Sequence, residues 1–117
     1  MRAPAVLLVC AALAVAASCG GAAVSCPNDA PESCPSPAPS YSGQVQAIIQ
    51  SRCTTCHAPG GLEPTKPLQT YTQVNDLRLM LLTQVASCRM PLSGAPPLSP
   101  DERQALLGWL VCGAPNN

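Results

Sequence analysis

The chain is poor in large aromatic side chains and in charge. Its 117 residues include no Phe, one Trp and two Tyr, and only 10% of them are charged. Six Lys and Arg residues balance six Asp and Glu residues, which excludes the basic surface of a nucleic-acid-binding protein and an acidic tail. A small domain with so little aromatic area needs another source of buried apolar surface.

Cysteine and proline are abundant instead: the chain has eight Cys and 14 Pro residues, and two of the cysteines lie near the N-terminus.

Residues 1–18 carry one Arg followed by an unbroken apolar run and small residues, which predicts a secretory signal peptide. Residues 16–20, Ala-Ala-Ser-Cys-Gly, look like a bacterial lipobox in which Cys19 becomes the lipid-bearing first residue. We therefore expect an exported lipoprotein, membrane-anchored in the cell envelope and facing the periplasm. Cleavage after Ala23 or Ser25 would instead release a soluble periplasmic protein.

The next segment, residues 19–40, is predicted to be a linker. Five prolines among Ser, Ala, Asn and Asp exclude a helix or a central strand there. An extended Pro-rich spacer would hold the following domain, residues 41–117, some distance from a lipid at Cys19. Cys26 and Cys34 lie within this spacer, and we expect them to form a disulfide with each other.

The central motif is Cys-Thr-Thr-Cys-His at residues 53–57. One helical turn sets two thiols at the separation of the haem vinyl groups, and the adjacent His57 can ligate the iron. A redox-active dithiol is an alternative, but it favours a preceding strand and needs no ligating His. A zinc site would need a second pair of ligands, and the chain has one His. The motif therefore predicts a metal-binding protein with one haem c attached through Cys53 and Cys56.

On these residues the chain resembles the class I c-type cytochromes over residues 41–115. The resemblance implies an all-α fold of three to four helices around a covalently attached haem. It also implies that Met90, in a Pro-bounded loop, is the second axial ligand of the iron beside His57. Met80, which sits at core spacing in a predicted helix, is the alternative, and an open sixth position is another.

Residues 66–68, Lys-Pro-Leu, resemble the Pro-Leu segment of this family, which offers a carbonyl to the second N–H of the ligating imidazole. Pro67 is therefore the expected acceptor, with Pro64 as the alternative. Leu68 would pack on the haem. Tyr71 would either reach a haem propionate or fill the core.

Three helices are predicted in the domain. The first begins near Ser40 and carries an apolar face through the motif; the second is capped by Thr70 or Thr72 and runs to about residue 87. The third has a full helix start at residues 99–102, Ser-Pro-Asp-Glu, and Trp109 should anchor its crossing with the first. Cys88 and Cys112 are expected to pair and to close the Met90 loop.

The sequence thus predicts a monomeric, single-electron carrier between redox proteins of the envelope, with Arg89 or Lys66 at the docking surface. It is not expected to be an enzyme, because an iron with both axial positions filled excludes substrate. One alternative is a haem enzyme or gas sensor with an open sixth position. Another is a haem-free surface module stabilised by disulfides or zinc.

Overall fold

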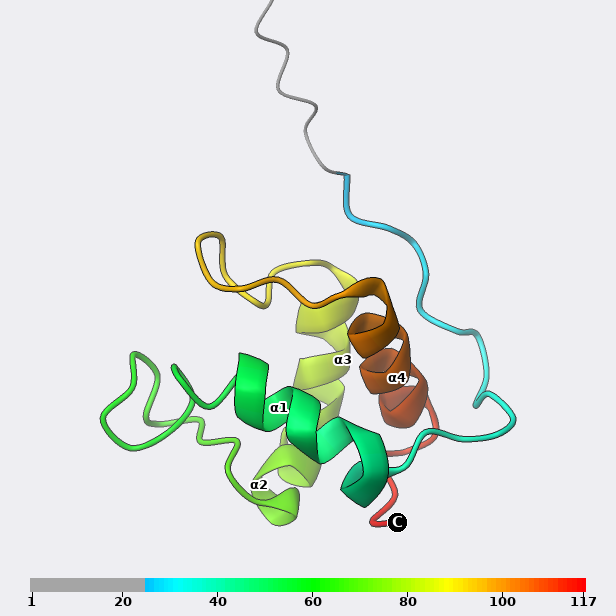
Figure 1. The fold of residues 1–117 in the computed structure, drawn as a ribbon, viewed down its shortest axis with the longest axis horizontal. Coiled ribbons are helices and arrows are strands. Elements are labelled where there is room, and N and C mark those ends of the chain that lie inside the picture. Colours follow the sequence, from blue (N-terminus) through cyan, green and yellow to red (C-terminus); the bar gives the residue numbers. More distant parts are fainter. Residues whose placement is uncertain (1–24) are drawn as a thin grey trace, which may run out of the picture.

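A computed structural model describes residues 25–117, and this part of the chain is helical without strands. A short π-helix precedes four α-helices, and Figure 1 shows α3 and α4 side by side with α1 crossing near them. The all-α class is therefore confirmed for these residues. The predicted signal peptide and the lipidated Cys19 lie outside them. The elements are η1 (Tyr41–Val45), α1 (Gln46–Arg52), α2 (Tyr71–Asp76), α3 (Arg78–Ala86) and α4 (Pro100–Val111).

The helix starts follow the capping signals of the sequence. The Ser40 hydroxyl accepts the Gly43 N–H at the start of η1. Thr70 and Ser99 each begin a helix with a capping box, in which Gln73 and Glu102 respectively bond back to the cap. The predicted caps at Thr70 and Ser99 are confirmed, although the role of Gln73 was not foreseen.

The second predicted helix is two helices. Leu77 leaves helical geometry, with ψ near 6°, and separates α2 from α3. No Gly or Pro lies at this position, so no local pattern predicts a break. The prediction of one continuous helix to residue 87 is wrong, and the break lets α3 turn toward α4.

All three large aromatic residues meet in one cluster. The ring centroids of Tyr41 and Tyr71 lie 5.1 Å apart, and those of Tyr41 and Trp109 lie 5.4 Å apart. Trp109 is fully buried and donates its indole N–H to the Pro115 carbonyl at 2.9 Å. Trp109 therefore anchors the packing of α4 on the first helical segment, as predicted, with η1 forming the contact.

The predicted disulfides are wrong in their pairing. Cys26 bonds to Cys88, and Cys34 bonds to Cys112. Residues 26–39, which we call the strap, pass along α4 (Figure 1), so that Cys26 meets the end of α3 and Cys34 the end of α4. Cys26 and Cys34 are eight residues apart, and extended chain of this length spans up to roughly 25 Å. A disulfide needs Cα atoms within about 7 Å, so an extended strap keeps these two cysteines too far apart to pair. The strap thus joins the domain instead of spacing it.

Gly108 of α4 packs directly against two proline rings of the strap. A Cβ at this position would lie 3.1 Å from a carbon of Pro35 and 3.2 Å from one of Pro39. A helix-interior Gly normally costs about 0.5–1 kcal/mol relative to Ala. Its presence here is explained by the room that the two proline rings need. In the described residues no helix is long and apolar enough to cross a membrane.

Candidate functional site

The motif at residues 53–57 forms a turn that continues from α1. Cys53 is the C-cap of α1, and its carbonyl accepts the N–H groups of Cys56 at 3.1 Å and His57 at 2.9 Å. This is the helical turn that the spacing predicts. It brings both thiols and the imidazole to the wall of one cavity.

The chain then folds back beneath this turn. The Cys56 carbonyl accepts the Glu63 N–H, and the His57 carbonyl accepts the Leu68 N–H, both at 2.9 Å. A Cβ on Gly61 would lie 2.3 Å from the Cys56 carbonyl oxygen, so only Gly fits there. Leu68 is buried and lines the cavity.

The imidazole is oriented by a backbone carbonyl, but not by the predicted one. His57 Nδ1 lies 3.0 Å from the Lys66 carbonyl oxygen. Neither Pro67 nor Pro64 provides this acceptor, because the Leu68-to-His57 hydrogen bond sets the loop one residue away from the predicted register. With Nδ1 occupied as donor, Nε2 is the ring nitrogen left to act as a ligand.

Cys53 is partly buried at the wall of the cavity. Burial, with a smaller contribution from Cys56, raises the pKa of Cys53 to about 11, and both residues are free thiols. A redox-active or metal-binding cysteine normally has a lowered pKa. The environment of Cys53 therefore argues against the dithiol alternative.

The cavity has a volume of about 420 Å³, within the range of about 300–1,000 Å³ typical of ligand and cofactor pockets. Most of its wall is apolar. Three of its apolar side chains are largely exposed to solvent: Leu62 at 84%, Leu92 at 54% and Met80 at 47%. Such exposure around one hollow indicates a site for an apolar group. Its other apolar lining residues include Leu68, Leu77, Leu81, Val85, Pro91, Ala95, Leu98 and Leu106.

Two methionines line the same cavity. Met90 lies in the loop after α3, where its N–H and that of Arg89 both donate to the Gln84 carbonyl. Met80 lies in the first turn of α3. The structure thus brings the motif and both methionine side chains to one cavity. Their proximity does not follow from the sequence, because these residues lie far apart in it.

Tyr71 has the second of the two roles considered for it. It is not among the residues that line the cavity, and its hydroxyl donates to the Ala114 carbonyl at 2.9 Å. Tyr71 belongs to the aromatic cluster of the core. Its expected place at the cofactor is therefore corrected, because Ala114 already takes its hydroxyl.

Arg52 lines the cavity, on the helix face expected to point at the haem, and it has a partner that was not predicted. Its guanidinium Nε lies 3.1 Å from both carboxylate oxygens of Glu102, which joins α1 to the start of α4. Hydrogen bonds from the Ser99 backbone and from Arg52 lower the pKa of Glu102. The pair fixes the Arg52 guanidinium at the cavity wall, with its charge balanced by Glu102. Sequence spacing gave no signal for it, since 50 residues separate the partners.

The prediction of a metal-binding protein is wrong for a metal ion held by protein side chains alone. Across residues 25–117 no group of three or more His, Cys, Asp and Glu side chains is placed to hold a metal ion. Two disulfides provide the cross-links instead. A zinc-stabilised module is likewise unsupported, because the only His lies beside just two free thiols.

Comparison with known proteins adds no family. No family model, curated protein or solved structure matches this chain.

Proposed function

We propose that the chain is a haem-attachment protein that carries single electrons in the cell envelope. The observation that supports this most strongly is the shared cavity, whose wall holds the two free thiols, the oriented imidazole and a loop thioether. Haem brings four equatorial nitrogens to its iron, so the chain would need to add only the axial ligands. The missing cluster of protein ligands for a free metal ion is compatible with this.

The residues divide into three tasks. Cys53 and Cys56 would form thioether bonds with the two vinyl groups, and His57 would bind through Nε2 while the Lys66 carbonyl holds its ring orientation. Met90 would supply the second protein ligand of the iron from the loop after α3. The apolar wall would exclude water from the macrocycle and so help to set its reduction potential.

Met90 is the better placed of the two methionines. The Met90 backbone N–H donates to the Gln84 carbonyl at 3.1 Å, which holds this residue in place. Met80 follows Leu79, which is 70% exposed, so this part of α3 faces solvent. We infer that Met80 closes the cavity rim. Met90→Ala should abolish the long-wavelength absorption band of a Met-to-iron bond in oxidised protein, and Met80→Ala should retain it.

The two disulfides favour export to an oxidising compartment, where c-type haem is also attached. With both axial positions filled, the chain would exchange electrons through the exposed edge of the haem without catalysing bond chemistry. The cavity opening near Leu62 and Leu92 would be the side that meets redox partners.

The direct test is expression with export, in hosts with and without haem-attachment machinery. The proposal expects a product from the first host that is heavier by one haem and shows the visible spectrum of a low-spin haem. A colourless product of unmodified mass from both hosts would overturn it.

A second candidate, a haem-free disulfide-stabilised module, is favoured by the two cross-links and by the missing metal-ion site in the described residues. It predicts cooperative unfolding of the colourless protein with two free thiols. The electron-carrier proposal predicts instead that the cavity side stays loose until haem is attached.

A further inference from the structure

The end of α3 is held by an arginine from another helix. The last carbonyls of a helix have no partner within it and need an outside donor. Here the Arg103 guanidinium, from the first turns of α4, donates to the carbonyls of Val85 and Ala86. Arg103 is 8% exposed, and it is the one charged side chain that counts as buried in residues 25–117.

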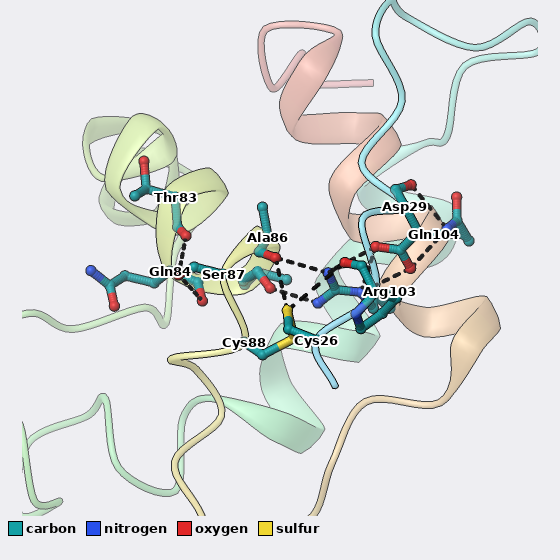
Figure 2. Close-up of a disulfide and its surroundings, with 11 residues drawn as sticks. Cys26, Asp29, Thr83, Gln84, Ala86, Ser87, Cys88, Arg103 and Gln104 are labelled. Atoms are coloured by element: carbon teal, nitrogen blue, oxygen red, sulfur yellow. Dashed lines mark hydrogen bonds and ion pairs between the residues drawn. A yellow bond between two sulfur atoms is a disulfide. The ribbon is translucent and has the colours of Figure 1, made fainter. Parts of the chain in front are cut away.

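The strap provides the countercharge. Arg103 Nε lies 2.9 and 3.0 Å from the two carboxylate oxygens of Asp29, and the Gln104 amide donates to the same carboxylate at 3.2 Å. Figure 2 shows Arg103 between Asp29 and the end of α3. A buried cation without this partner would be strongly destabilising, so the strap completes the arrangement.

A covalent bond reinforces the same place. The Cys26–Cys88 disulfide joins the strap to the residue two positions before Met90, as Figure 2 shows for the two cysteines. The Gln84 carbonyl holds the N–H of Met90 from within α3. The turn that leads to Met90 is thus tied by α3 itself, by Arg103 and by the strap.

We propose that Arg103 is a positioning residue for Met90, acting with Asp29 of the strap to set the turn from which Met90 enters the cavity. This inference rests on the proposed function, in which Met90 binds the iron. A thioether is the weaker axial ligand and is easily displaced, so its binding depends on a backbone held in place. The strap is accordingly part of the ligand-holding structure.

A planar guanidinium is required for this task. Arg103 reaches two carbonyls with its terminal nitrogens while Nε faces the carboxylate. A lysine ammonium is a point charge on a flexible stem and cannot reproduce this fork. Arg103→Lys therefore retains the charge and removes the geometry.

The test measures how readily added imidazole displaces Met90 from the oxidised, haem-loaded protein. We expect Arg103→Lys and Asp29→Asn to bind imidazole about tenfold more tightly than the wild type, because charge-assisted hydrogen bonds at the turn are lost. Glu32→Gln, at an exposed carboxyl elsewhere in the strap, should match the wild type. Leu110→Val, in the core end of α4, controls for lowered stability alone.

A second readout follows the backbone directly. Amide hydrogen exchange at Met90 should accelerate in Arg103→Lys and Asp29→Asn, but not in Leu110→Val. If Arg103→Lys fails to fold, Asp29→Asn retains the arginine and tests the same connection. Unchanged imidazole affinity in haem-loaded Asp29→Asn would overturn this proposal alone. A wild-type chain that acquires no haem would overturn the proposed function as well.

Discussion

The two sides of the domain are built differently. On the strap side, two disulfides and the Asp29–Arg103 ion pair bind residues 26–39 to the helices. On the cavity side lie the loops at residues 53–70 and 87–98 (Figure 1). The first loop carries the two free thiols, and both loops carry exposed apolar side chains. On the strap side, the cysteines and the buried charge all have partners within the protein. The cavity side has the composition of a surface that another group covers.

This difference indicates a division of labour. Cross-links hold one side irrespective of any cofactor, and that side fixes the ends of α3 and α4. The other side presents groups that gain partners only when an apolar body enters the cavity. Perturbing each side separately should therefore give different signatures, in haem content for the cavity and in stability for the strap.

The largest expected effect is on the cavity side. Cys53→Ser combined with Cys56→Ser should abolish covalent haem attachment, because among residues 25–117 these are the two free thiols at the cavity. Intact mass and the absorption spectrum after acid extraction measure this. Cys34→Ser with Cys112→Ser serves as the matched control and should retain the haem. Haem that resists extraction from the first double variant would contradict the assignment.

On the strap side, the same control variant should lower stability. The Cys34–Cys112 disulfide closes a separation of 78 residues, for which the chain-entropy model gives about 4 kcal/mol. For a domain of this size that corresponds to a fall in melting temperature of about 20 °C. Differential scanning calorimetry of the variant and the wild type measures it. A fall of only a few degrees would show that the strap side is not held mainly by this bond.

A smaller effect is expected where the cavity loop folds back. Gly61→Ala would push a Cβ against the Cys56 carbonyl, and we expect a cost of about 2 kcal/mol in unfolding free energy. Gly60→Ala is the control: its φ of 84° is strained for Ala, but no atom lies within 4 Å of the added Cβ. Chemical denaturation compares them. Equal losses in the two variants would rule out the collision as the cause.

The smallest effect is a pH dependence from the strap. The Arg103 hydrogen bond, more than the opposing desolvation, lowers the pKa of Asp29 from its usual value of 3.8. A carboxyl with a lowered folded-state pKa contributes stability above about pH 4 and loses it as the pH falls through the folded-state pKa. Melting temperatures of wild type and Asp29→Asn should therefore converge at low pH. A constant difference between them from pH 7 to pH 2 would contradict this.

How far the sequence predicts this molecule depends on the range of the interaction. The caps at Thr70 and Ser99 and the turn at residues 53–57 are local, and local patterns predicted them. The break at Leu77 has no local signal. The acceptor for His57 was predicted one residue away, because only the folded loop shows that Leu68 pairs with the His57 carbonyl.

Long-range pairings were out of reach for the same reason. The disulfides join residues 62 and 78 positions apart, and the course of the strap along α4 decides which cysteines meet. A Pro-rich composition excludes helices but does not tell a free spacer from a bound strap. Proximity of Met90 to the motif was expected only through a resemblance, and the cavity now supplies a physical basis for it.

The central claim is that the cavity side receives a haem bonded to its thiols. Trypsin cleaves after Arg52, so the peptide that begins at Cys53 should carry the whole attachment site. From protein exported with haem-attachment machinery, the account predicts that mass spectrometry finds this peptide heavier by one haem, with both thiols blocked to alkylation. The same peptide at its unmodified mass, with both thiols alkylated, would contradict the account.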